Sequence, residues 1–198
     1  MIRILSNWPD ASRIGWRKQP EASGAAVIDI NMGCPAKKVI GGEAGSALMR
    51  DLDLAIRLID AVVAAVSIPV TVKMRLGWDD QNRNAPELAR RAEQSGVAAV
   101  TVHGRTRNQF YKGKADWSAV RQVVEAVTIP VIVNGDCQSL DDARTMLDLS
   151  GAQGVMIGRA AVGRPWLVGQ IARGLANATT PAAPPLAVRQ AAALEHYD

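Results

Sequence analysis

Cys34 lies in a sequence context that presents its thiol. An apolar run over 25–30 is followed by the polar Asn31, and Gly33 and Pro35 flank the cysteine in a turn that no regular element continues. A cysteine held in such a turn is displayed. Free cysteines are, however, usually small buried core residues, so this stretch alone leaves both interpretations open.

Polar residues end several other apolar runs of the chain. The last residues of the strand-like runs are Asn31, Lys73, His103, Asn134 and Gly158. Lys73 alternates with Val72 and Met74, which places it on the face that would line a barrel interior, where a lysine needs a partner; the alternative is a solvated edge strand. His103 would be structural on its own, but Arg105 and Arg107 close behind it favour an anion-handling loop.

Two glycine-containing tripeptides are candidate phosphate loops. They are Asn134-Gly135-Asp136 and Ile157-Gly158-Arg159, and the helix expected after Arg159, over 164–176, would add its positive end. Either one alone could be a tight turn with a capping Asp or a surface Arg, so the functional interpretation rests on the pair. Lys37 and Lys38 could meet a substrate phosphate or be simply solvated. Cys137 has no displaying turn, and the cysteines and histidines have no metal-ligand spacing.

The elements that must position these residues alternate along the chain. Strands are expected at about 25–31, 69–74, 97–103, 130–134 and 154–158, each followed by a segment of helical period. Asp51 and Ser139 are expected helix N-caps, with Asp142 in capping-box spacing to Ser139. This order predicts an α/β fold, a partial TIM (β/α)8 barrel with about five parallel strands.

The ends of the chain differ from this core. Residues 1–22 show no regular period beyond a possible strand over 1–5, and we expect the partial barrel over 23–178. A Pro-rich linker over 179–185 is followed by the start of a further helical domain over 186–198.

Composition is that of an ordinary globular domain. The 198 residues are 48% hydrophobic and 21% charged, with a formal net charge of +4. This excess permits an anionic partner without being a nucleic-acid signature. Two cysteines and no visible apolar leader favour the cytoplasm, and no run is long enough to span a membrane.

Five ordered motifs resemble the tRNA-dihydrouridine synthases, most closely their bacterial B-type branch. The motifs are Asp29-Ile-Asn-Met-Gly-Cys-Pro, Val72-Lys-Met-Arg-Leu-Gly-Trp, Val102-His-Gly-Arg-Thr-Arg, Pro130-Val-Ile-Val-Asn-Gly-Asp and Gly154-Val-Met-Ile-Gly-Arg-Ala. The resemblance covers about residues 21–198. It implies reduction of a uridine in tRNA to 5,6-dihydrouridine, with FMN as the flavin and NADPH as the electron source.

The resemblance also implies roles for individual residues. Cys34 would be the general acid that protonates C5 of the uracil. Lys73 and His103 would lie near the flavin, and the ribityl phosphate would be held by Asn134, Gly135, Asp136, Gly158 and Arg159. Arg105, Arg107 and Lys37 would contact RNA phosphates. The expected partner is tRNA, bound by a monomer without metal.

The chain departs from the family pattern at both ends. The first strands with their flavin motifs are missing, and the chain stops early in the C-terminal helical domain, so we expect a fragment. Two alternatives remain: an FMN-barrel reductase of a free pyrimidine, resembling dihydroorotate dehydrogenase, and a non-catalytic half-barrel.

Overall fold

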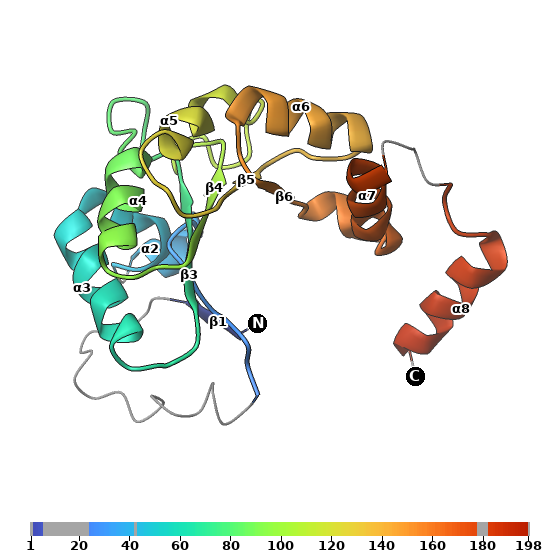
Figure 1. The fold of residues 1–198 in the computed structure, drawn as a ribbon, viewed down its shortest axis with the longest axis horizontal. Coiled ribbons are helices and arrows are strands. Elements are labelled where there is room, and N and C mark those ends of the chain that lie inside the picture. Colours follow the sequence, from blue (N-terminus) through green and yellow to red (C-terminus); the bar gives the residue numbers. More distant parts are fainter. Residues whose placement is uncertain (1, 6–23, 42, 178–181, 198) are drawn as a thin grey trace.

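One parallel sheet forms the centre of the computed structural model, which describes residues 2–5, 24–41, 43–177 and 182–197. Its six strands follow chain order: β1 (Ile2–Leu5), β2 (Ile28–Asn31), β3 (Val70–Arg75), β4 (Ala99–His103), β5 (Val131–Asn134) and β6 (Gly154–Met156). All neighbours are parallel, as in a (β/α)8 barrel. Among the described strands β1 and β6 stand at the two edges of an open arc (Figure 1). The predicted partial barrel is confirmed. The possible strand over 1–5 forms β1 beside the five others, and residues 1 and 6–22 lie outside the described ranges.

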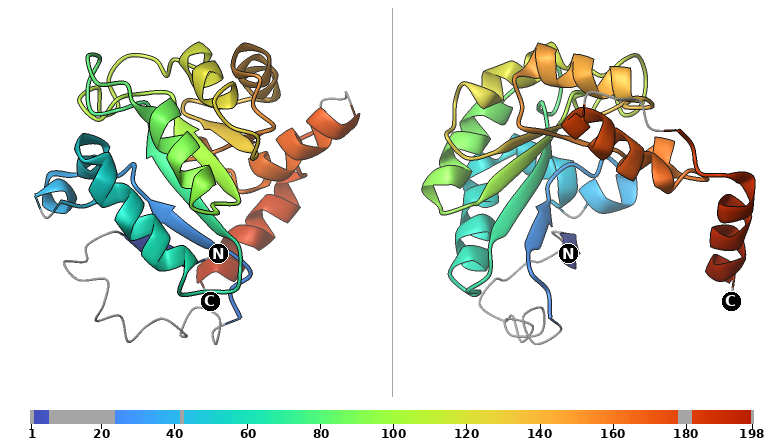
Figure 2. Two further views of the ribbon diagram at one scale, coloured as in Figure 1. Left: turned by 60° about the vertical axis from the view of Figure 1, so that its left-hand side comes forward. Right: turned by 45° about the vertical axis from the view of Figure 1, so that its right-hand side comes forward.

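Helices alternate with the strands and cover one face of the sheet. The helices are α2 (Lys37–Ile40), α3 (Leu52–Val63), α4 (Ala85–Gln94), α5 (Arg121–Val124), α6 (Leu140–Ser150), α7 (Trp166–Asn177) and α8 (Leu186–Tyr197). The short 3-10 segments are η2 (Gly45–Arg50), η3 (Ser118–Val120) and η4 (Arg159–Ala161). Helices α3 to α6 follow the outside of the arc, whereas α8 lies apart from the sheet in Figure 1 and in the right-hand view of Figure 2.

The predicted helix caps are present. The Asp51 side chain accepts the Leu54 N–H at 2.9 Å, and the Ser139 hydroxyl accepts the Asp142 N–H at 3.0 Å. The Asp142 carboxylate in turn accepts the N–H of Gln138, at 2.9 Å. These side chains supply acceptors for backbone N–H groups that a helix leaves unpaired at its start.

The two faces of the strands have different composition. Residues at alternate positions of β3, β4 and β5 are apolar and at most 3% exposed, and they belong to one cluster with helix residues such as Ile59, Leu88 and Met146. The intervening positions of β2 to β5 carry the polar residues Asp29, Asn31, Thr71, Lys73, Arg75, Thr101, His103 and Asn134. Because side chains alternate across a strand, the helices cover the apolar face and the polar set shares the other.

Candidate active site

The strand ends differ in two places from the sequence prediction. Asn31, His103 and Asn134 end their strands as predicted. However, β3 continues two residues beyond Lys73 to Arg75, because the ladder to β4 extends to the Arg75–His103 pair. Strand β6 ends at Met156, so Gly158 lies in the following loop. Lys73 therefore sits within the sheet, opposite Asn31 and Thr101.

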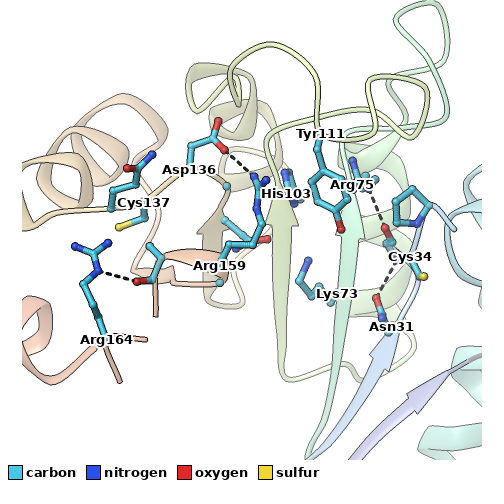
Figure 3. A pocket seen from close by; sticks show the side chains of 17 residues that line it. Asn31, Cys34, Lys73, Arg75, His103, Tyr111, Asp136, Cys137, Arg159 and Arg164 are labelled. Atoms are coloured by element: carbon cyan, nitrogen blue, oxygen red, sulfur yellow. Dashed lines mark hydrogen bonds and ion pairs between the residues drawn. The ribbon is translucent and has the colours of Figure 1, made fainter. Parts of the chain in front are cut away.

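A cavity of about 550 Å³ opens at this edge of the sheet (Figure 3). All eight predicted site residues line it: Cys34, Lys73, His103, Asn134, Gly135, Asp136, Gly158 and Arg159. Figure 3 places Cys34 beside Asn31 at one end and Asp136 with Arg159 toward the other, with Lys73 and His103 between them. Lys37, Arg105 and Arg107 are not among the lining residues.

The Cys34 loop is held by its backbone. The Cys34 carbonyl accepts two bonds from Ser46, from the N–H at 3.0 Å and from the hydroxyl at 2.9 Å. Asn31 Oδ1 accepts the Gly33 N–H at 3.1 Å. Cys34 is itself half-buried, so these bonds fix the backbone of the residue at the cavity, and its side chain is not enclosed in the core.

Gly45 permits this packing. It adopts φ of +58°, and a Cβ there would lie 2.7 Å from the Cys34 carbonyl oxygen and 2.9 Å from Val39 Cγ1. A side chain at position 45 would therefore displace the cysteine loop.

Arg75 joins the Cys34 loop to the loop after β4. It is 2% exposed, and its Nε donates to the Gly33 carbonyl at 2.8 Å. Its Nη1 donates to the carbonyls of Thr106 and Phe110, both at 2.9 Å. Burial, aided by the charge of nearby Arg105, lowers the pKa of Arg75 to about 10, so the group stays protonated at neutral pH.

His103 is neutral in this setting. Burial, together with the positive charges of Arg75, Lys73 and Arg105, lowers its pKa to about 3. Arg105 Nη1 lies 3.3 Å from His103 Nε2. Since the guanidinium can only donate, Nε2 must accept and the ring proton must sit on Nδ1.

Asp136 organises the far end of the cavity. Its carboxylate accepts Arg105 Nη1 at 3.0 Å and Nη2 at 2.6 Å, the Ala115 N–H at 2.9 Å, and Arg159 Nη2 at 3.3 Å. Burial raises the pKa of Asp136, but the bonds from Arg105 and Ala115 and the charges of Arg105 and Arg159 outweigh this and leave the pKa below its ordinary value. Its oxygens are therefore already occupied by donors of the protein.

The helix expected over 164–176 is present as α7 (Trp166–Asn177), but its first residue does not follow Arg159 directly. Arg159 begins the single 3-10 turn η4, and α7 starts only at Trp166. A 3-10 turn this short carries little dipole, so positive charge at this end comes from the Arg159 and Arg164 side chains, which both line the cavity.

Sequence reasoning missed Arg75, Tyr111 and Arg164 as lining residues. The signal for Arg75 was available, because it lies two positions after Lys73 and so on the same strand face. Tyr111 approaches Arg75 and Arg159, whose Cζ atoms are 5.6 and 4.8 Å from its ring centroid. This contact joins loops far apart in sequence, and no local pattern indicates it.

The remaining expectations concern Cys137, metals and membranes. Cys137 is buried and nevertheless lines the cavity, and burial raises the pKa of its thiol to about 11. Among the described residues no group of three or more His, Cys, Asp or Glu is arranged to hold a metal ion. The helices of the described ranges include none long and apolar enough to cross a membrane.

Comparison with known proteins gives the family. The family model described as dihydrouridine synthase matches residues 17–198. The chain belongs to the dihydrouridine synthase family. It is 54% identical over 181 residues to a probable tRNA-dihydrouridine synthase of Rickettsia conorii, covering 91% of this chain and 55% of that protein.

Two further relatives agree. A probable tRNA-dihydrouridine synthase of Rhizobium leguminosarum bv. phaseoli is 62% identical over 75% of this chain and 47% of its own length. The tRNA-dihydrouridine synthase B of Xanthomonas axonopodis pv. citri is 51% identical over 88% of this chain and 53% of its own length. The chain thus spans about half the length of the curated relatives it matches.

Solved structures support the fold. A mandelate oxidase structure matches 80% of this chain and 48% of its own, with a TM-score of 0.55 and 22% identity. A putative phosphonomutase from Burkholderia cenocepacia matches 79% of this chain and 70% of its own, with a TM-score of 0.55 and 15% identity. At these identities the likeness concerns the fold alone.

Proposed function

We propose that this chain carries the catalytic pocket of a flavin-dependent enzyme that reduces uridine in tRNA to dihydrouridine. The observation that carries the proposal is the fixed, half-buried Cys34 at the edge of a cavity lined by cations. Family membership supplies the substrate class, because the relatives are named tRNA-dihydrouridine synthases. It also favours tRNA over a free pyrimidine.

The cavity suits a flavin mononucleotide. Its volume of about 550 Å³ is in the range of cofactor sites. Among the described residues that line it, Asp136 alone carries a carboxylate, and donors of the protein surround that group. Arg159 and Arg164 would hold the phosphate, next to Gly158, where a Cβ would meet nothing within 4 Å. Asp136 would serve the phosphate indirectly, by orienting Arg159.

FMN, reduced by NADPH, would supply the hydride that adds to C6 of the uracil. Lys73 would stabilise negative charge on the pyrimidine edge of the flavin, and neutral His103 would lie beside it without adding charge. These residues, with Asn134 and Gly135, complete the proposed cofactor site.

Cys34 would complete the reduction of the C5–C6 double bond. Its S–H bond breaks, a C–H bond forms at C5, and the thiolate that remains is close enough to Arg75 for their charges to interact. The target base must leave the tRNA stack to reach this depth of the pocket.

The test uses the purified chain with FMN, NADPH and an unmodified tRNA transcript. Wild type should bind flavin, seen in the visible spectrum, and form dihydrouridine, measured by mass spectrometry of the digested RNA. Cys34→Ala should keep the flavin spectrum and lose product. Product from the free pyrimidine orotate instead of tRNA would favour the alternative reductase; no flavin binding at all would support the half-barrel.

A further inference from the structure

A second cavity opens among the loops that follow β2 and β3. It measures about 530 Å³ and is lined by Met49, Arg50, Trp78, Asp79, Asn82 and Asn84. Trp78 lies three residues beyond Arg75 of the first cavity, which is at most ~11 Å of extended chain. Because loops after parallel strands lie at one edge of the sheet, the two cavities share a face of the molecule.

Two guanidinium groups stack on the indole of Trp78. Arg50 Cζ lies 4.9 Å and Arg107 Cζ 4.8 Å from the ring centroid. Neither arginine has a carboxylate partner among the described residues; Arg107 Nη1 contacts the amide oxygen of Asn108. Stacking uses the faces of the guanidinium groups and leaves N–H edges for another acceptor, and it restricts these side chains before any ligand arrives.

Two buried polar atoms beside this stack lack partners. Arg107 Nε, a donor, and Asn84 Oδ1, an acceptor, are buried without a hydrogen bond to any residue that the structure describes. The amide nitrogen of Asn84 is fixed by the Met49 carbonyl at 2.7 Å, which determines the orientation of Oδ1. Buried polar groups without partners are rare. Arg107 Nε can still donate a hydrogen bond to an acceptor, and Asn84 Oδ1 can still accept one from a donor.

The charges favour an anion, although Asp79 also lines the cavity. Asp79 Oδ1 accepts three bonds, from the N–H groups of Gln81 and Asn82 and from the Asn82 amide, at 2.9 to 3.1 Å. Against this one partly neutralised carboxylate stand Arg50, which lines the cavity, and Arg107, which stacks on Trp78. Neither arginine has an acidic partner in the described part of the chain. The local charge around the cavity is therefore positive.

We infer that the Trp78 cavity binds one ribose-phosphate unit of the tRNA strand next to the target nucleotide. A phosphate supplies the acceptors that Arg50 and Arg107 lack, and a ribose 2′-hydroxyl is a donor of the kind Asn84 Oδ1 lacks. The inference rests on the proposed function, because a uridine drawn into the first cavity brings its flanking backbone across this rim.

The test compares tRNA binding by flavin-loaded wild type, Arg50→Ala and Trp78→Ala over a KCl series. Each substitution should weaken binding roughly tenfold, as expected when about one charge-assisted hydrogen bond is removed. The slope of log affinity against log salt should fall by about 0.7 to 0.9, because one phosphate of the RNA is no longer neutralised by the protein. Arg57→Ala, which removes an exposed arginine of α3, is the matched control and should change neither quantity beyond the general effect of net charge.

A second measurement tests whether the cavity contacts the ribose 2′-hydroxyl. A five-nucleotide RNA should bind wild type more tightly than the DNA of the same sequence, and Trp78→Ala should reduce this preference. Wild-type tRNA affinity in both variants would overturn the inference and leave the proposed function intact, as would a change confined to the KM for NADPH. Flavin-loaded wild type that binds no tRNA would overturn both.

Discussion

Arg105 and Asp136 form a two-point ion pair that ties the loop after β4 to the loop after β5. Arg105 is 2% exposed and also donates to the carbonyls of Lys112 and Gly113. Asp136 adopts the left-handed φ of 58° and contacts Arg159 with the same carboxylate. One acidic residue thus fixes two arginines and the path of a loop.

Asp136→Asn should destabilise the fold by about 3 kcal/mol or more, because it leaves the buried Arg105 charge without its counterion. Asparagine tolerates a left-handed φ, so backbone strain is not added. Urea unfolding measures the change in stability. The control is Asp141→Asn in the exposed pair with Arg144, which should cost less than about 1 kcal/mol. Equal effects at the two positions would show that the buried pair has no special role.

Acid should weaken the protein through His103. Its pKa falls from 6.5 in the unfolded chain to about 3 in the folded one. Between these values the unfolded state binds a proton that the folded state does not, so the free energy of unfolding decreases as the pH falls from 6.5 toward 3. Urea midpoints at pH 7, 6 and 5 should decline less in His103→Gln than in wild type. Parallel declines would contradict the buried neutral imidazole.

Gly45→Ala should move the Cys34 loop. The added Cβ collides with the Cys34 carbonyl and also occupies a positive φ, which together should cost about 2–4 kcal/mol. Gly113→Ala is the control, since φ there is +64° but nothing lies within 4 Å of the added atom. Urea unfolding and the rate of Cys34 alkylation should change more at position 45 than at 113. Cys137 should not react at pH 8, because burial raises its pKa to about 11.

Arg75→Lys should lower the rate of dihydrouridine formation more than the affinity for flavin. A lysine keeps the charge but cannot reach the Gly33, Thr106 and Phe110 carbonyls in the same fork geometry. The cysteine loop and the loop after β4 then lose their shared donor. Flavin titration and single-turnover product formation separate the two quantities, and a proportional decrease in both would mean that Arg75 acts only on cofactor binding.

The sequence predicted the elements better than the contacts between them. The caps at Asp51 and Ser139 and the five later strands follow from local patterns that repeat in the structure. The apolar residues of 120–127 recur at helical spacing, but the structure forms only the 3-10 turn η3 and the one-turn α5 there.

Site residues were found at the ends of the strands and in the loops directly after them, since a parallel sheet gathers strand ends at one edge. The fork of Arg75 and the position of Tyr111 depend on the loop after β4 folding back over the cavity. The Trp78 stack likewise needs Arg50 and Arg107 from two other loops. Such contacts between side chains of different loops arise from tertiary packing, and no periodic pattern in the sequence indicates them.

The bonds of Arg75 end on backbone carbonyls, and every amino acid has one. Substitutions at Thr106 and Phe110 therefore leave the acceptors in place as long as the loop keeps its path. Side-chain substitutions on the outer surface of this loop therefore leave the support of the cysteine loop intact.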